Sequence, residues 1–416
     1  MPPPAAPLRT LTIDHVGAQG DGRAREGDRW VSVPFTLAGE VVEVSGEGDR
    51  LRLERISSPS SERTAPSCRH FTRCGGCTLQ HMAPAPYAAF KRDLIVRALK
   101  TRGLEAEVTE TWITPPASRR RATFTARKSG KTIMVGFHGR KSHELIALEE
   151  CPVARPAIVA ALPKLAGILA PLFSGKEDLS LLVTETASGL DLHVTGIPKQ
   201  ATRLARAEVT SAALRAGFAR VSLEGEDVLT ERPPRLPIGA ASLLPPPGGF
   251  LQASAEAETE IARLVLGHLG GAKHAADLFS GCGTFALRLA ERIPVFAAES
   301  GRPAIEALRA AANAAPGLKP VTADVRDLFR NPLAAVELAR FDGLVLDPPR
   351  AGASAQAAEI ARSTVPRVAY VSCDPATLAR DLRALVDGGY RLLRAHPVDQ
   401  FLWSAHVEAV ALLEKP

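Results

Sequence analysis

The chain has 416 residues, of which 45% are hydrophobic and 23% charged, and 51 Lys and Arg against 45 Asp and Glu give a net charge of +6. This composition excludes a fibrous or wholly disordered chain, and at about 150 residues per domain the length predicts two or three domains. No apolar run reaches the roughly 18 residues of a membrane span, and the start, MPPPAAPLRT, lacks the apolar core of a signal peptide. We therefore expect a cytoplasmic protein with no membrane partner, whose closely spaced cysteines are metal ligands or catalytic groups rather than disulfides.

The first segment, residues 8–56, alternates short apolar runs with glycines and lacks helical periodicity. Four or five short strands with tight turns fit a small β-barrel of the oligonucleotide-binding type. An accessory β-domain without a ligand is an equal alternative. A Ser- and Pro-rich tract at 57–67 is the first predicted linker.

The middle segment is predicted to be a mixed α+β domain that ends at proline-rich tracts near 232–247. Its predicted elements are a helix at 87–101, strands at 123–127, 132–138, 181–186 and 191–195, and two further helices.

The last segment alternates strands with helices. We expect strands at 274–278, 295–300, 320–324, 341–347 and 367–373, and helices at 254–269, 285–292, 303–314 and 355–363. This alternation predicts an α/β domain with a doubly wound parallel sheet, in which ligands bind at the carboxyl ends of the strands.

A glycine loop, DLFSGCGTF, follows the first strand of that sheet. It lacks the GxGxxG spacing of dinucleotide folds and the GKS/T of a phosphate loop, and it contains no basic residue. Glu299, Asp324 and Asp347 end the second, third and fourth strands. Three carboxylates at successive strand ends suit a nucleoside ligand that is not polyanionic, and helix capping by these acids is the alternative.

A further apolar strand ends at Cys373, where Asp374 and Pro375 suit the N-cap and first position of a helix. We expect the helix dipole to favour the thiolate there, in the crevice where the ligand binds. A small buried cysteine with no chemical role is an equal alternative on position alone.

Four motifs together resemble the RNA 5-methyluridine methyltransferases, a family of class I S-adenosylmethionine-dependent enzymes. These are the segment Asp347-Pro-Pro-Arg350, the segment SCDPATLARD around Cys373, the closing segment DQFLWSAHVE that ends at Glu408, and Phe250-Leu-Gln252. The resemblance implies that Cys373 is the nucleophile and Glu408 the base. It also implies cofactor contacts from Gln252, Phe279, Thr284, Glu299, Asp324 and Asp347, with contact between Asp347 and the uracil base as the alternative.

The chemistry explains these residue types, because uracil C5 is too weak a nucleophile to take a methyl group unaided. A thiolate that adds to C6 makes C5 enolate-like, and C5 then attacks the sulfonium methyl group. A base must remove the C5 proton before the cysteine can leave by elimination. The DPPR motif has no cysteine of the kind found in RNA cytosine-C5 methylases, and no flavin-type GxGxxG occurs, so both of these classes are disfavoured.

A second group of cysteines comprises Cys68, Cys74, Cys77 and Cys151. Four thiolates suit zinc or an iron–sulfur cluster, and only one CxxC pair is present where zinc sites more often have two. Together with the later Cys-Pro pair, the spacing resembles the [4Fe–4S] site of the same family. That resemblance implies a [4Fe–4S] cluster that holds the middle domain together and presents RNA-facing loops, with zinc and unmetallated thiols as alternatives.

A basic strip lies between residues 119 and 141. It contains no acid and eight basic residues, Arg119, Arg120, Arg121, Arg127, Lys128, Lys131, Arg140 and Lys141. Because Phe124, Phe137 and His138 are interleaved, we expect phosphate contacts and base stacking, against the alternative of a solvated hairpin. Phe401 and Trp403 are stacking candidates near the nucleophile by position only.

The resemblance spans nearly the whole chain. It implies a TRAM-type, OB-like barrel at 1–58, an RNA-binding central domain with the cysteine cluster at 59–245, and a Rossmann-like methyltransferase domain at 246–416. Departures occur at Thr284 and Asp374, where the family often has Asn, and at 402–404, where Leu-Trp-Ser replaces a common Pro-His-Thr. Barrel and cluster together resemble the 23S rRNA branch, so we expect a monomer that methylates 23S rRNA. A tRNA substrate, or a non-catalytic RNA-binding or chaperone protein, are the alternatives.

Overall fold

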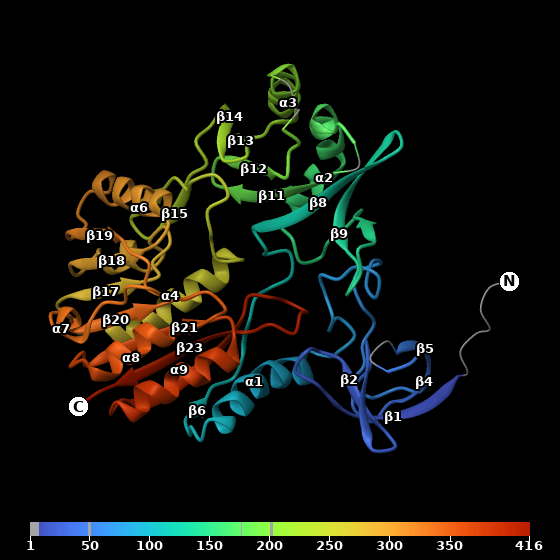
Figure 1. Ribbon diagram of the computed structural model, residues 1–416, viewed down its shortest axis with the longest axis horizontal. Coiled ribbons are helices and arrows are strands. Elements are labelled where there is room, and N and C mark those ends of the chain that lie inside the picture. The colour runs from blue at the N-terminus through green and yellow to red at the C-terminus, as the bar shows by residue number, and fades with distance from the viewer. Residues whose placement is uncertain (1–7, 49–50, 176, 200–202) are drawn as a thin grey trace.

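The computed structural model describes residues 8–48, 51–175, 177–199 and 203–416. The described residues form three large sheets and a two-stranded hairpin. In Figure 1 the N-terminal sheet is blue, the central one mainly green and most of the last one yellow to red. No helix in the described ranges is long and apolar enough to cross a membrane.

The N-terminal sheet is antiparallel and five-stranded, in the order β3-β2-β1-β4-β5. Its strands are β1 (Arg9–Val16), β2 (Gly22–Glu26), β3 (Arg29–Val33), β4 (Val41–Ser45) and β5 (Arg52–Ser58). Side chains alternate between the two faces, so Ile13, Val33, Val42 and Val44 are buried on one side. The all-β prediction is confirmed. No β3–β5 pairing closes the sheet in the described part of the chain, so the barrel stays a prediction.

The central sheet has seven strands in the order β10-β9-β8-β11-β12-β13-β14. These are β8 (Arg121–Ser129), β9 (Thr132–His138), β10 (Leu145–Ala147), β11 (Asp178–Thr186), β12 (Gly189–Thr195), β13 (Arg220–Leu223) and β14 (Glu226–Thr230). The short helix η1 (Ala170–Leu172) and helices α2 (Pro156–Leu169) and α3 (Arg203–Ala216) bury apolar faces against one side of it. A hairpin of β15 (Leu236–Ile238) and β16 (Ala241–Leu243) leads to the last domain, where the sequence predicted linkers.

The last sheet has nine strands, and its main path runs β19-β18-β17-β20-β21-β23-β22-β6. Its C-terminal strands are β17 (Ala275–Leu278), β18 (Val295–Glu299), β19 (Val321–Val325), β20 (Gly343–Leu346), β21 (Arg367–Ser372), β22 (Arg391–Asp399) and β23 (Glu408–Glu414). The helices around it are α4 (Ala255–Leu269), α5 (Ala286–Leu289), α6 (Arg302–Ala314), α7 (Ala335–Leu338), α8 (Ser354–Arg362) and α9 (Pro375–Asp387). The pairs from β19 to β21 are parallel, and β23 is antiparallel, which confirms the predicted doubly wound α/β domain.

One segment of the predicted central domain packs instead on the C-terminal domain. Helix α1 (Pro84–Thr101) contributes Ile95 and Leu99 to the core of the last sheet, and it lies beside α9 in Figure 1. After it, β6 (Glu107–Val108) and β7 (Trp112–Ile113) both pair with β22. The domain boundaries at 58 and 245 remain predictions. The segment of α1, β6 and β7 lies before residue 245 in the chain but packs on the domain that follows it.

Candidate functional site

A cavity of about 720 Å³ opens at the carboxyl ends of the parallel strands, around the predicted glycine loop. The loop turns sharply because Phe279, Gly281 and Gly283 all have positive φ, the last at +91°. A Cβ on Gly283 would collide with the Leu308 side chain of α6, so only glycine lets the loop pack this closely. The backbone of the loop therefore forms the floor of the cavity.

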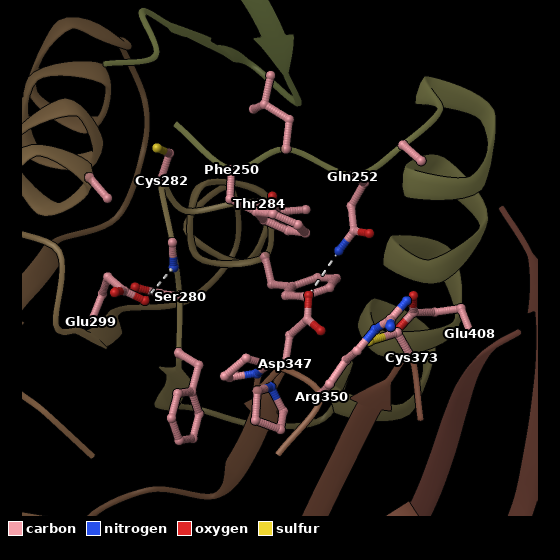
Figure 2. A pocket seen from close by; sticks show the side chains of 18 of the residues that line it. Phe250, Gln252, Ser280, Cys282, Thr284, Glu299, Asp347, Arg350, Cys373 and Glu408 are labelled. Atoms are coloured by element: carbon pink, nitrogen blue, oxygen red, sulfur yellow. Dashed lines mark hydrogen bonds between the residues drawn. The ribbon is translucent and has the colours of Figure 1, made fainter. Parts of the chain in front are cut away.

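Five of the six predicted cofactor residues line this cavity: Gln252, Phe279, Thr284, Glu299 and Asp347. Glu299 accepts a hydrogen bond from the loop N–H of Gly281 at 3.3 Å (Figure 2). It also accepts one from Gly301 N at 2.8 Å. Asp324 is the exception, because its side chain is exposed and does not line the cavity. The residues of this segment that do line the cavity are Arg326 and Asp327, two and three positions after Asp324.

Several residues of the lining were not singled out from the sequence as site residues. The rings of Phe250 and Phe329 border the cavity while 66% and 48% exposed, and such rings suit the face of a purine. Arg121 lies over the Phe250 ring, with its guanidinium carbon 5.3 Å from the ring centroid. Gln400 is buried between two other site residues. Phe250 and Gln400 belong to recognised motifs, whereas nothing in the sequence marked Phe329.

The two predicted catalytic residues meet on one wall of the cavity (Figure 2). Cys373 follows β21, Glu408 begins β23, and these strands are adjacent in the sheet. Arg350 lies near both, and its positive charge favours the thiolate form of Cys373. The DPPR loop therefore brings a cation to the two groups, a feature that the sequence analysis did not assign.

The surroundings of the Cys373 thiol favour its protonated form. Burial and the nearby Glu408 carboxylate raise the pKa of Cys373 to about 11, against the opposing effect of Arg350. Asp374 caps α9 as predicted, accepting from Ala376 N and Thr377 N at 3.0 Å each. Desolvation and the neighbouring acids therefore oppose the effect of the helix end, and the dipole-stabilised thiolate stays a prediction.

Asp347 and Glu408 are joined by two glutamine amides. Gln252 Nε2 donates to Asp347 Oδ2 at 2.8 Å, and Gln400 Nε2 donates to Gln252 Oε1 at 2.7 Å and to Glu408 Oε2 at 2.6 Å. Burial raises the pKa of both carboxyls, and the charge of Asp347 raises that of Glu408 further. Each amide hydrogen bond opposes the shift. A carboxyl of this kind can hold or release a proton near neutral pH, as a general base must.

The loop before Glu408 is fixed by buried groups of α1. Lys91 Nζ lies 2.8 Å from Asp399 Oδ1 and also donates to the carbonyl oxygen of His406, while Tyr87 donates to the other Asp399 oxygen. Lys91 and Asp399 are fully buried. Thr78 N and Leu79 N donate to Trp403 O at 2.8 and 2.9 Å, so the segment after Cys77 also holds this loop.

All four predicted ligand thiols, those of Cys68, Cys74, Cys77 and Cys151, line one cavity of about 330 Å³. This cavity shares Arg350 and Phe401 with the larger one. In the described ranges, no three or more His, Cys, Asp or Glu side chains lie close enough together to hold a metal ion as they stand. Four thiols on one cavity are the right donors for a metal or an iron–sulfur cluster. The positions of their side chains do not by themselves form a metal-binding site.

The basic strip is not a continuous free cationic surface, because Arg120, Arg127 and Arg140 form ion pairs. The expected phosphate contact is corrected for the buried Arg120 and stays a prediction for the partly exposed residues. Arg120 is buried and pairs with Glu258 of α4, and its Nε donates to Gln252 O at 3.1 Å. Arg127 pairs with Asp178 at 2.6 Å and Arg140 with Asp21 at 2.5 Å. Arg120 therefore joins the central sheet to the segment that carries Gln252.

Of the aromatic residues of the strip, Phe124 is not available for base stacking, whereas Phe137 and His138 are partly exposed. Phe124 is buried, and its ring stacks on Phe137 with centroids 4.9 Å apart. Lys131 and Lys141 remain exposed at the hairpin ends. Of the positional candidates near the nucleophile, Phe401 lines the larger cavity and Trp403 does not.

Comparison with known proteins agrees with this geometry. The family model for tRNA (uracil-5-)-methyltransferases matches residues 247–416. A Caulobacter vibrioides protein named as an RNA methyltransferase is 48% identical over 98% of this chain and 100% of its own length. A Pseudomonas entomophila protein named 23S rRNA (uracil(1939)-C(5))-methyltransferase is 35% identical over 99% of this chain and 94% of its own.

Among solved structures, the Pyrococcus abyssi tRNA (uracil-54, C5)-methyltransferase in complex with S-adenosyl-L-homocysteine superposes with a TM-score of 0.75. It covers 97% of this chain and 100% of its own, at 22% identity, which supports the class I methyltransferase fold. The chain therefore belongs to the RNA (uracil-5-)-methyltransferase family and is an S-adenosylmethionine-dependent RNA uracil-5-methyltransferase.

Proposed function

We propose that this enzyme acts as a monomer and methylates C5 of a uridine in 23S rRNA through a covalent bond between Cys373 and C6 of the base. The observation that carries the proposal is the convergence of the Cys373 thiol, the Glu408 carboxyl and Arg350 on one wall of a single cavity. A nucleophile and a base on adjacent strands are what addition at C6 and proton removal at C5 require.

The steps assign one role to each side chain. The Cys373 thiol gives its proton to solvent, and Arg350 stabilises the resulting thiolate. The sulfur forms a bond to C6 while the electron pair of the C5–C6 double bond moves toward C5 and the O4 carbonyl. S-adenosylmethionine, when bound, would supply a methyl group on a sulfonium, which C5 takes while the electron pair of the broken carbon–sulfur bond stays on that sulfur. Glu408 then removes the C5 proton, the double bond reforms, and the sulfur of Cys373 leaves. Gln252, Glu299 and the glycine loop are the proposed cofactor contacts.

The rRNA target is supported by the relative from Pseudomonas entomophila, whose name states that substrate. Nucleoside mass spectrometry on purified 23S rRNA and tRNA, from a deletion strain and its parent, tests it. Loss of 5-methyluridine from 23S rRNA alone, restored by the wild-type gene but not by Cys373→Ala, is the expected result. Loss from tRNA alone would keep the reaction and replace the target. Full restoration by Cys373→Ala would favour a non-catalytic role.

The covalent step has its own test, because fluorine at C5 cannot leave as a proton. RNA with 5-fluorouridine at the target should accumulate a methylated adduct that survives denaturing electrophoresis. Cys373→Ala should form none, and Glu408→Gln should accumulate adduct even with ordinary uridine. Absence of adduct from the wild-type enzyme would contradict the mechanism.

We also propose that Cys68, Cys74, Cys77 and Cys151 hold a [4Fe–4S] cluster, supported by their shared cavity. Protein purified without oxygen should contain about four iron and four acid-labile sulfide per chain. Cys77→Ala should lose both, and Cys282→Ala, outside this cavity, should keep both. One zinc without sulfide would contradict the cluster. A Cys77→Ala protein that lacks iron but remains folded and fully active would contradict its structural role.

The N-terminal sheet is our proposed additional RNA contact, in the manner of a TRAM barrel. On its outer face Arg25 lies 4.9 Å from the ring centroid of Trp30, which is 38% exposed. An exposed aromatic ring with cationic neighbours suits an unpaired base. Trp30→Ala should weaken RNA binding about 5- to 100-fold, the range expected for one stacked base, without changing S-adenosylmethionine binding. Unchanged RNA affinity would remove this contact.

A further inference from the structure

Gln400 is a buried amide directly after β22, and it makes three side-chain hydrogen bonds. Its Oε1 accepts from the backbone N–H of Ala253 at 2.8 Å. Its Nε2 donates to Gln252 Oε1 at 2.7 Å and to Glu408 Oε2 at 2.6 Å. All the donors and acceptors of this amide, apart from one carbonyl lone pair, are therefore used within the site.

One backbone group fixes the direction of the whole network. Because the Ala253 N–H can only donate, the oxygen of Gln400 must face it and the NH2 group must face Gln252 and Glu408. Gln252 must then present its oxygen to Gln400 and its NH2 group to Asp347. Both carboxyl groups thus receive hydrogen bonds, and neither amide can turn without leaving a buried group unpaired.

The backbone that sets this direction is itself held from another domain. Arg120 N donates to Ala253 O at 2.9 Å, and Arg120 Nε donates to Gln252 O at 3.1 Å. The buried ion pair with Glu258 fixes the Arg120 side chain. The direction of the network therefore depends on the packing of the central sheet against the catalytic domain.

We infer that Gln400 is a positioning residue that holds Glu408 as an acceptor at one oxygen and leaves the other oxygen to take the C5 proton. The inference rests on the proposed role of Glu408 as the base. Gln400 acts on the rate through Glu408 and also sets the rotamer of Gln252, so the two sides of the cavity are aligned by one side chain. Hydrogen bonding to a carboxylate favours its charged form, which a base requires before it acts.

The groups that act on Glu408 come from three neighbouring strands. Asp347 follows β20 and raises the pKa of Glu408 through its charge, Arg350 of the same loop lowers it, and the Cys373 thiol after β21 is the other titratable neighbour. Gln400 is the uncharged group that contacts Glu408. Its replacement by Met removes the hydrogen bond to Glu408 and leaves the number of charges around Glu408 unchanged.

The experiment measures tritium released from RNA with tritium at uridine C5, across a pH series, because release reports proton removal. Gln400→Met should slow release about 10- to 100-fold at neutral pH. The pH profile should move to higher pH and recover there, since loss of the hydrogen bond raises the pKa of the base. Gln400→Glu, which has the same size but cannot donate when ionised, should move the profile further in the same direction.

The matched control is Gln356→Met, because Gln356 is also a fully buried glutamine, bonded to the backbone N and O of Leu333 at 2.8 and 3.1 Å. It should lower stability without moving the pH profile. An unmoved profile in both Gln400 variants, or the same movement in Gln356→Met, would overturn the inference. Adduct formation with 5-fluorouridine RNA separates the two proposals: if the wild type forms adduct and the profiles coincide, only the role of Gln400 fails.

Discussion

Two buried polar networks meet at consecutive residues of this enzyme, Asp399 and Gln400, and they differ in charge balance. The carboxylate of Asp399 is paired with the ammonium of Lys91, and both are fully buried. One residue further, Gln400 links two carboxyl groups, those of Asp347 and Glu408, through neutral amides and without a buried cation. Arg350, the nearest opposing charge, lies on an exposed loop.

The difference explains why one network holds structure and the other can do chemistry. The buried Lys91–Asp399 pair fixes the loop at 400–407, because Lys91 also binds carbonyl groups of that loop. The carboxyls of Asp347 and Glu408 lack such a partner, and desolvation raises the pKa of both, so they can exchange protons near neutral pH. Because the two networks are adjacent, the Lys91–Asp399 pair fixes the backbone next to Gln400, whose amide binds the titratable Glu408 carboxyl.

The largest effect is expected from Glu408→Gln, which removes the titrating base. Methylation turnover should fall about 10²- to 10⁴-fold, because proton removal from C5 loses its acceptor. The same change should raise the free energy of unfolding, and the gain should grow as pH rises above the ordinary carboxyl range. The sign follows because the raised folded-state pKa of Glu408 costs stability once the unfolded chain ionises.

Asp399→Asn, which breaks the buried ion pair with Lys91, should have the opposite effect on the free energy of unfolding. Lys91 would lose the carboxylate that favours its charged form against burial, so stability should fall while the pH profile of catalysis keeps its shape. Urea unfolding and single-turnover rates, measured for both variants at matched pH, check the contrast. Equal and same-signed stability changes would remove the distinction between the networks.

Lys91→Met should destabilise the protein by about 3–5 kcal/mol, because Asp399 would be left buried and unpaired. The double change Lys91→Met with Asp399→Leu should recover most of that loss, since neither charge remains. The urea midpoints of unfolding of the two variants measure this difference in stability, provided that the dependence of the unfolding free energy on urea concentration is the same for both. A double variant as unstable as the single one would show that packing, not charge pairing, sets the role of Lys91.

The rate of methyl transfer should rise with pH through neutrality. Glu408 must be ionised to act as the base, and burial raises its pKa, while burial and the Glu408 charge raise the pKa of the Cys373 thiol to about 11. Both shifts favour the inactive, protonated forms at low pH, so both act in the same direction. Single-turnover rates at saturating RNA should show this rise, and a flat or falling profile would contradict the assigned roles.

The sequence could predict the site where residue position alone decides the outcome. Strand ends of a parallel sheet converge, so Cys373, Asp347 and Glu299 were correctly predicted to share a crevice. The prediction from sequence failed where a partner distant in the chain determines the environment of a side chain. Arg120 was predicted to face RNA, but its charge is paired with Glu258 of another domain. Asp324 ends the predicted strand, yet the chain turns into the cavity only afterwards.

The smallest effect is expected from Arg394→Ala, which removes an ion pair on the same strand as Asp399. Arg394 Nε lies 2.8 Å from Glu107 Oε2, a distance equal to that of the buried Lys91–Asp399 pair, but both side chains are more than half exposed. Water already solvates each charge, so the loss should be within about 1 kcal/mol and should shrink further in high salt. A loss as large as that of Lys91→Met would mean that the ion pair itself, and not its burial, stabilises β22. The expected small loss would assign the difference to desolvation, which also raises the pKa values of Asp347 and Glu408.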